Sequence, residues 1–371
     1  MRDNALTVAL ARLAGLPFSL FGRRPFVPPR KALILQPCCL SQVLLTTPLL
    51  SLLHETYPNT RFDWAVTDWA RPAIASNPHL TQLITLGQAP LEKLSWRELR
   101  TIAQQLRAEE YDTCFVPSRS TTAALLPWLA GIPQRVGLNV NGRGFAHTLP
   151  VTPPETAVHA ADIYLSLASG LGLDAEAIGP RGLEFYPSDV DRTAVTALLI
   201  EEIDWLGDVP LVILHPGGGQ NPARPDERKQ WPVERFALLG SQLIRKQGAR
   251  VVLVGGEQDR PLTQAVQGMM TTSVVDLAGR LTLGKLGALC EVADLYVGND
   301  TGPTHIAVAV GCPTLAIFGP SDPAFSGPYA PRGRVAALWS TEWREYEAPF
   351  SWDFGISVKD AGKTAVSLLT T

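Results

Sequence analysis

The sequence predicts an α/β protein with two domains, each built on a parallel β-sheet with helices on both faces. Two observations lead to this fold class. Short apolar runs alternate with helix-like segments from residue 31 onward, which is typical of strand–helix repeats. The alternation pauses at a proline-rich stretch and restarts, and 371 residues exceed what one hydrophobic core usually organises.

The first domain is predicted over residues 31–180. Its strands are expected at the short apolar runs KALILQP, RFDWAVT, LTQLITL, DTCFVPS and RVGLN. Its helices are expected at SQVLLTTPLLSLLHETYP, LSWRELRTIAQQLRAEEY and TTAALLPWLAG, the last ended by Gly131. Residues 151–187 join the two halves through a proline-rich stretch and a helix-like segment.

The second domain, residues 181–350, repeats the pattern and adds glycine turns. PLVILHPGGG, ARVVLVGGEQD, DLYVGNDTG and CPTLAIFGP each indicate a strand that runs into such a turn. Parallel strands end at one edge of their sheet, and ligands bind at that edge in open α/β sheets. Residues 351–371 are expected to form a last helix that could cross back to the first domain.

The composition excludes some classes of function. A net charge of -3 does not favour nucleic acid as the main partner. The cysteines are odd in number and show no metal-ligand spacing, so we expect reduced, mostly buried thiols in a cytoplasmic protein without a metal site. They are Cys38, Cys39, Cys114, Cys290 and Cys312.

Residues 1–30 form an extension that is apolar up to Phe21 and then basic and proline-rich. Arg12 and Pro17 interrupt the apolar part, and the strongest positive charge follows it, unlike in a secretory signal. Three interpretations stay open: a helix docked on the protein, a peripheral membrane anchor with a basic edge, and a transmembrane or signal segment.

The most specific motif is LYVGNDTGPTHIAVAVGCPTLAIFGPSDP, residues 295–323. A strand delivers Asp300, Thr301 and Gly302 to the start of a helix, where free N–H groups and the helix dipole favour an anion. His305 follows within the first turn and could face the same ligand. The alternative is ordinary helix capping by Asp300 or Thr301.

A second motif, HPGGGQNPARPDERKQWPVERFALL, places Gly217 and Gly218 after a strand and Lys229 before a helix. A lysine beside a glycine turn suits a diphosphate, although the Walker order is absent. In the third run, VGGEQD, Glu257 is the candidate for holding ribose hydroxyls. For both charged residues the alternative is a solvated side chain.

These runs resemble the ADP-heptose:lipopolysaccharide heptosyltransferases of glycosyltransferase family 9. The matching pieces are LILQPCCLSQVLLTTPLLSLLHETYP and the two long motifs, and the resemblance covers roughly residues 31–331. It implies the GT-B architecture, two Rossmann-like domains facing each other across a cleft. It also implies inverting transfer of a sugar from a nucleoside diphosphate, by default ADP-heptose, with no cofactor and no metal in the chemical step. The implied acceptor is the lipopolysaccharide core or another lipid-linked or polysaccharide glycan of the cell envelope.

The resemblance also assigns roles to residues. Lys229 matches the family lysine that neutralises the donor diphosphate, and Glu257 falls where an acid can bind ribose. Arg119, in PSRSTT, falls where basic residues contact the acceptor. The residues that match the family's donor motif are Asp300, Thr301, Gly302 and His305, with Gly217 and Gly218 in the preceding turn.

The chain departs from the family in its first loop. Family members usually carry Gly-Asp there, and that aspartate is the proposed base for the acceptor hydroxyl, whereas this chain has Ser41 and Gln42. An amide cannot accept a proton as a carboxylate does, although Ser41 and Gln42 could orient an acceptor. Asp68 and Asp300 are the candidate substitutes for the base.

Three functions are therefore compared. A working glycosyltransferase with an altered base explains the intact donor motifs. A non-catalytic relative that binds a nucleotide sugar or a protein partner explains Gln42. A Rossmann-type oxidoreductase is disfavoured, because the first strand is followed by no Gly-x-Gly-x-x-Gly. The first two functions place the protein in the cytoplasm, and an acceptor carried by a membrane would suit peripheral attachment to its inner face.

Overall fold

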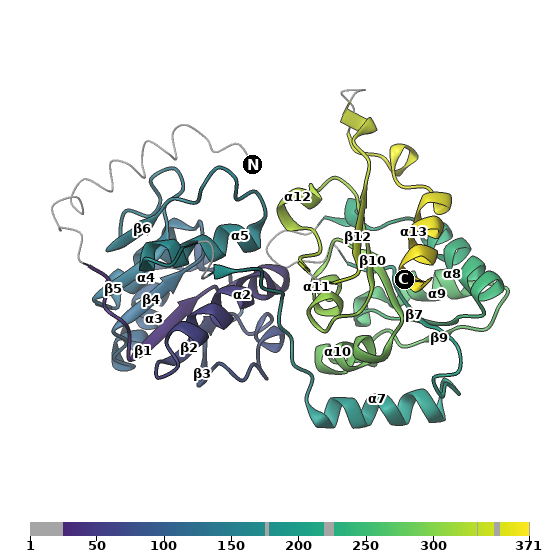
Figure 1. The fold of residues 1–371 in the computed structure, drawn as a ribbon, viewed down its shortest axis with the longest axis horizontal. Helices are drawn as coiled ribbons and strands as arrows, with labels where there is room; N and C mark the ends of the chain where they lie inside the picture. Colours follow the sequence, from purple (N-terminus) through teal and green to yellow (C-terminus); the bar gives the residue numbers. More distant parts are fainter. Residues whose placement is uncertain (1–24, 175–177, 219–225, 332, 345–348, 371) are drawn as a thin grey trace. The chain divides into compact units, whose positions relative to one another are not determined.

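A computed structural model of the chain describes residues 25–174, 178–218, 226–331, 333–344 and 349–370 (Figure 1). The chain forms two compact units that divide between Arg181 and Gly182. Each unit contains a six-stranded sheet in which every pairing is parallel, as the strand–helix repeats predict.

Unit 1 confirms the five predicted strands and adds a sixth. The strands are β1 (Lys31–Leu35), β2 (Arg61–Val66), β3 (Gln82–Thr85), β4 (Thr113–Val116), β5 (Gln134–Leu138) and β6 (Leu149–Val151). The helices are α2 (Leu40–Thr56), α3 (Trp96–Ala108), α4 (Thr121–Leu129) and α5 (Ala160–Leu165). The sequence prediction lacks β6 because Pro150 and the prolines after it indicate a loop. A proline is tolerated here because β6 is an edge strand.

Unit 2 contains the four strands that run into glycine turns. Its strands are β7 (Leu211–His215), β8 (Arg250–Leu253), β9 (Val275–Asp276), β10 (Leu295–Asn299), β11 (Thr314–Phe318) and β12 (Val335–Trp339). Its helices are α7 (Asp189–Glu201), α8 (Val233–Gln247), α9 (Arg260–Met269), α10 (Leu283–Val292), α11 (Gly302–Ala309), α12 (Pro323–Ser326) and α13 (Val358–Thr370). The prediction lacks β12, a half-exposed edge strand with little apolar contrast to its surroundings.

The last helix, α13, packs within unit 2. Its buried residues Ala361 and Ala365 belong to the same apolar core as Phe236 and Leu239 of α8. The contacts of this core therefore place α13 in unit 2, whereas the sequence suggests a helix that could cross back.

Both sheets have the same strand order. The order is β3-β2-β1-β4-β5-β6 in unit 1, and the corresponding order in unit 2 is β9-β8-β7-β10-β11-β12. The chain builds outward from β1 or β7, then returns to the centre and builds in the opposite direction. The order therefore reverses between β1 and β4 and between β7 and β10. Doubly wound sheets bind ligands beside such a reversal, at the carboxyl ends of the strands.

The segment before β1 is attached to unit 1. The N–H of Val27 donates to Gln134 Oε1 at 2.9 Å, and Gln134 Nε2 donates to the carbonyl of Val27 at 2.8 Å. The N–H of Arg30 donates to Asp112 Oδ2 at 2.9 Å. The remainder of the predicted extension, residues 1–24, lies outside the described residues.

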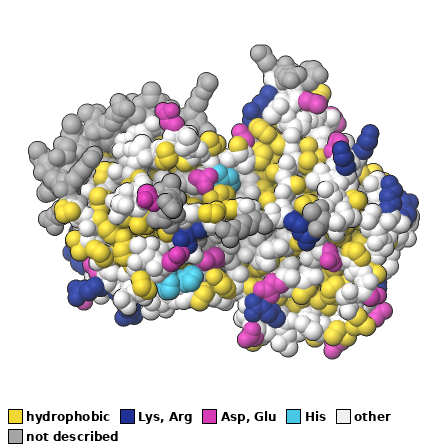
Figure 2. Space-filling view, viewed as in Figure 1, with side chains coloured by type: hydrophobic (Ala, Val, Ile, Leu, Met, Phe, Trp, Pro, Cys, Tyr) yellow, Lys and Arg dark blue, Asp and Glu magenta, His cyan; other side chains and the backbone are white. Residues whose placement is uncertain are grey.

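The described surface carries charges of both signs. On the face shown in Figure 2, Lys and Arg side chains are scattered among Asp and Glu side chains rather than gathered into one stripe. None of the helices in the described part of the chain is both long and apolar enough to cross a membrane.

Candidate functional site

The glycine turn after β7 is held by side chains from neighbouring strand ends. Asn299, the last residue of β10, is fully buried, and its Nδ2 donates to the carbonyls of Pro216 and Gly217 at 3.0 Å each. Gln230 Nε2 donates to the carbonyl of Gly218 at 2.8 Å. Protein donors thus satisfy the carbonyl oxygens that would otherwise repel an anion at this edge of the sheet.

Only glycine fits at the two central positions of this turn. Gly218 has φ +117°, and a Cβ there would collide with the Thr301 methyl group. A Cβ on Gly217 would collide with the Asp259 carboxyl group. The glycines therefore let the end of β7 approach the loops that follow β8 and β10.

Lys229 lies against Asp300, although 71 residues separate them in the sequence. Lys229 ends the short 3₁₀ helix η5 (Glu227–Lys229), and its Nζ is 2.5 Å from Asp300 Oδ2. The same carboxylate oxygen accepts a hydrogen bond from Ser321 Oγ at 2.7 Å. Because Asp300 is buried and Lys229 is half-buried, the interpretation of Lys229 as a solvated surface lysine is wrong.

The start of α11 is not capped by a side chain. Thr301 is the N-cap residue, but its hydroxyl lies 3.3 Å from Thr304 Oγ1 instead of accepting from the first turn. Ordinary side-chain capping is therefore not the role of this threonine. The helix N-terminus keeps its affinity for an anion, next to Gly302 and with His305 buried in its first turn.

The sequence points to Glu257, but in the structure Asp259 is the acid that contacts the glycine turn. Glu257, in the 3₁₀ helix η6 (Glu257–Asp259), is exposed and pairs with Arg260 at 3.1 Å. Asp259 is buried and accepts the N–H of Gly218 at 3.3 Å. The role of Glu257 at the ribose stays a prediction.

The sequence prediction does not include four residues of this site: Asn299, Gln230, Ser321 and Asp259. All four lie inside the motif runs, and all but Ser321 are within two residues of a predicted site residue. Their place in the motif runs could have pointed to them, but the sequence does not show the direction of their side chains. At this edge of its sheet, unit 2 presents the Lys229 cation, the Thr301 hydroxyl and the uncapped N-terminus of α11. These three groups together suit a diphosphate.

The first loop of unit 1 has no acid at its helix start. Gln42 is the third residue of α2 and is exposed, Ser41 is half-buried, and the first turn contains no acidic residue. Gln36 Nε2 donates to Thr46 Oγ1 at 3.3 Å and lies 3.5 Å from the carbonyl of Pro117, which links the ends of β1 and β4. The first turn of α2 therefore carries the amide of Gln42 and no carboxylate.

The other candidates in unit 1 also follow strand ends. Asp68 follows β2, accepts from Thr85 Oγ1 and from Gln88 Nε2, the latter at 2.9 Å, and is half-buried. Arg119 follows β4 and is exposed. Both therefore lie at the carboxyl edge of the sheet, as predicted.

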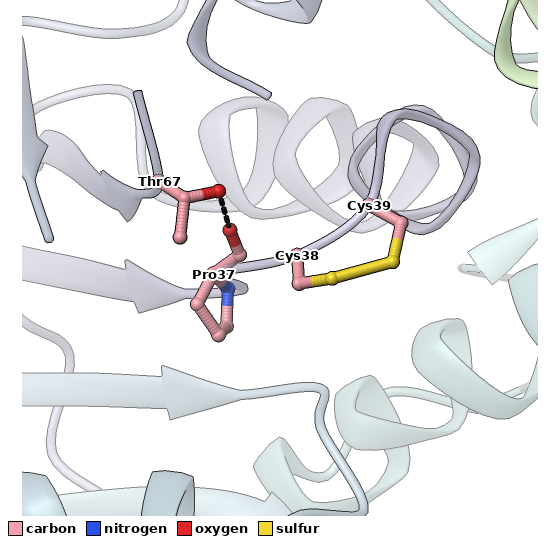
Figure 3. The surroundings of a disulfide bond; sticks show 4 residues. All are labelled: Pro37, Cys38, Cys39 and Thr67. Carbon is pink, nitrogen blue, oxygen red and sulfur yellow. Dashed lines mark hydrogen bonds between the residues drawn. A yellow bond between two sulfur atoms is a disulfide. The ribbon is translucent and has the colours of Figure 1, made fainter. Parts of the chain in front are cut away.

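Cys38 and Cys39 are joined by a disulfide bond (Figure 3). The expectation that these thiols are reduced is wrong for this pair, whereas Cys114, Cys290 and Cys312 are free and buried as expected. Cys39 has φ 124° and is the N-cap residue of α2. The loop before it is fixed to the end of β2, because Thr67 Oγ1 donates to the carbonyl of Pro37 at 2.7 Å. Sequence spacing could not reveal this bond, since adjacent cysteines do not indicate a pairing by themselves.

Known sequences match most of the chain. A profile of glycosyltransferase family 9 (heptosyltransferase) matches residues 99–349. The chain is 28% identical to lipopolysaccharide heptosyltransferase 2 of Escherichia coli K12, over 83% of this chain and 88% of that protein. It is 26% identical to lipopolysaccharide heptosyltransferase 3 of E. coli, over 82% and 87%.

Solved structures share the fold of the described chain. A family 9 glycosyl transferase from Veillonella parvula aligns with a TM-score of 0.78 and 23% identity, over 92% of this chain and 97% of that one. E. coli ADP-heptose LPS heptosyltransferase II aligns with a TM-score of 0.72 and 24% identity, over 91% and 98%. The predicted GT-B architecture of two Rossmann-like sheets is thereby confirmed. The chain belongs to glycosyltransferase family 9, the heptosyltransferase family.

Proposed function

We propose that this chain transfers a heptose, with inversion, from ADP-heptose to the lipopolysaccharide core or another glycan of the cell envelope. The names of its relatives support the sugar and the acceptor, and an E. coli heptosyltransferase of the same fold was solved with ADP. The observation that carries the proposal is the pairing of Lys229 with Asp300 beside the uncapped start of α11.

The donor diphosphate takes Lys229 away from Asp300. A diphosphate carries more negative charge than one carboxylate, so the ammonium group and the α11 N–H groups bind it more strongly. Asp300, still held by Ser321, then presents its carboxylate to the hydroxyl groups of the sugar. The glycine turn, with Gly217 and Gly218, lines the same edge.

Asp68 is the proposed base for the acceptor hydroxyl. It follows β2, the strand next to β1, and so lies on the same sheet edge as the loop with Gln42. Asp300 is the poorer candidate, because its carboxylate, held by Ser321, already serves the hydroxyl groups of the donor sugar in this proposal. Ser41, Gln42 and Arg119 then orient the acceptor by hydrogen bonds.

The donor half of the proposal is tested by calorimetric titration with ADP, UDP and GDP. We expect ADP to bind, Lys229→Ala to raise its Kd by about 10- to 100-fold through loss of a charge-assisted contact, and Lys246→Ala, on the exposed end of α8, to change nothing. If none of the three nucleotides binds and Lys229→Ala has no effect, the proposed donor site is refuted.

The catalytic half is tested by turnover of ADP-heptose with a deacylated core acceptor. We expect measurable turnover in the unaltered chain, a loss of about 100-fold or more in Asp68→Asn, and a gain in Gln42→Asp that restores a carboxylate to the family position. A chain that binds the donor but turns over only as Gln42→Asp would instead support the non-catalytic alternative, which rests on Gln42.

Attachment to the inner face of the cytoplasmic membrane is part of the proposal, on the evidence of the sequence of residues 1–24. Co-sedimentation with anionic vesicles compares the whole chain with one that starts at residue 25, since residues 27–30 bond to unit 1. Loss of sedimentation on truncation supports the anchor. Equal sedimentation of the two chains contradicts it.

A further inference from the structure

Three buried polar side chains form a line behind the glycine turn. Tyr296 in β10 has its hydroxyl 2.9 Å from Nδ1 of His215, the last residue of β7. His215 Nε2 lies 3.7 Å from Oδ2 of Asp259, which ends η6 after β8. Tyr296, His215 and Asp259 are 0%, 2% and 7% exposed, so three neighbouring strands and their ends contribute one buried polar side chain each.

Asp259 joins this line to two glycine turns. Its Oδ1 accepts the N–H of Gly218 at 3.3 Å, and its Oδ2 accepts the N–H of Gly256 at 2.8 Å. Burial by itself raises the pKa of Asp259, but His215 and the two backbone N–H groups together bring that pKa below its usual range. The carboxylate is therefore ionised at neutral pH and holds the turns after β7 and β8 in one arrangement.

Glycines surround the line closely. A Cβ on Gly217 or on Gly255 would collide with Asp259, and a Cβ on Gly298 would collide with the ring of Tyr296. Buried polar groups in such tight packing destabilise a fold unless each is satisfied, and an apolar side chain would fill the same space without that penalty. Packing alone does not account for the choice of these side chains.

We propose that His215 and Asp259 are positioning residues of the donor site. Tyr296 fixes the ring of His215, whose Nε2 faces Asp259, and Asp259 fixes the Gly217–Gly218 turn in the shape that receives the donor diphosphate. This inference rests on the proposed function, because it concerns the turn that binds the donor. The three side chains act on the donor only through the glycine turn, whereas Lys229 and Asp300 act on it directly.

The test measures ADP binding and donor kinetics in Asp259→Asn and Tyr296→Phe. In Asp259→Asn an amide group replaces one oxygen and faces a backbone N–H, so we expect the Kd of ADP to rise about 10-fold or more. Tyr296→Phe removes a single hydroxyl and is expected to raise the Kd about threefold. In both variants the KM for the donor should rise while kcat at saturating donor stays near its original value, because a bound donor restores the turn.

The matched control is Asp294→Asn. Asp294 accepts the N–H of Leu211 at 2.8 Å and so joins the amino end of β7, the opposite edge of the same sheet. We expect this variant to lower the melting temperature without changing the Kd of ADP. Hydrogen exchange in residues 211–218 should increase in Asp259→Asn and recover when ADP is added.

Two results would overturn the inference, and they are distinguishable. If Asp259→Asn and Tyr296→Phe lower the melting temperature but bind ADP as tightly as the unaltered chain, the line is structural only, while a weakened Lys229→Ala still supports the proposed function. If the unaltered chain binds no nucleoside diphosphate, the proposed function and the inference fail together. Should Asp259→Asn not fold, the Kd of ADP for Tyr296→Phe decides between the same two outcomes.

Discussion

Replacing Asn299 by aspartate should destabilise unit 2 through the glycine turn. The substitution preserves shape but removes both hydrogen bonds from Nδ2 to Pro216 and Gly217, and it leaves a carboxylate facing two carbonyl oxygens. Each buried acceptor that loses its donor costs about 1–3 kcal/mol, and Oδ1 can still accept from Trp231. We therefore expect a loss of about 3–5 kcal/mol, which lowers the melting temperature by about 10 °C in a unit of this size.

The destabilisation caused by Asn299→Asp should depend on pH. A buried carboxylate with one oxygen facing two carbonyl oxygens has its pKa raised above the unfolded value of about 3.9, so the folded state binds more protons than the unfolded state. The destabilisation is then complete at neutral pH and shrinks as the pH falls through the raised pKa. Melting temperatures of Asn299→Asp and of the unaltered chain should therefore converge on acidification.

Asn139→Asp is the matched control for this measurement. Asn139 follows β5 and uses its Oδ1 to accept the N–H of Gly144 at 3.3 Å, a role that a carboxylate oxygen also fills. We expect a change in melting temperature of no more than a few degrees at any pH. Equal melting temperatures for Asn299→Asp and the unaltered chain at neutral pH would refute the claim that Asn299 holds the turn.

Three further predictions follow from single contacts. Ser321→Ala removes a donor to Asp300 and should lower kcat about 10-fold with little change in the Kd of ADP, as measured by steady-state kinetics and calorimetry. Iodoacetamide should label no cysteine of the native, unreduced chain, because Cys38 and Cys39 are paired and burial keeps the other thiols inert. After reduction it should label only Cys38 and Cys39, as measured by intact mass. Burial lowers the pKa of His147 to about 3, so the unfolded state takes up this proton before the folded state as the pH falls. Between pH 6.5 and 5, the free energy of unfolding of the unaltered chain should fall by about 1.5 kcal/mol more than that of His147→Leu, as measured by urea titrations.

The edge of the sheet could be predicted from the sequence, but the partners at that edge could not. The sequence points to Lys229 because it follows a strand and a glycine turn, and to Asp300 because a strand delivers it to the start of a helix. Parallel strands end together, so both are expected at one edge. The sequence names Glu257 as the acid after the glycines of the third run, VGGEQD, and does not single out Asp259. In a 3₁₀ turn, two residues of separation turn a side chain from solvent to the interior, and no periodicity in such a short segment shows which one is buried.

The location of Gln42 separates the question of donor binding from the question of acceptor activation. Gln42 lies in unit 1, whereas every contact described around Lys229, Asp300 and the glycine turn lies in unit 2. A change at Gln42 therefore leaves these contacts within unit 2 in place. Donor affinity should respond to Lys229→Ala but not to Gln42→Asp, and turnover should respond to both. If Gln42→Asp instead changed the Kd of ADP as strongly as Lys229→Ala does, the division of donor binding and acceptor activation between the two units would be wrong.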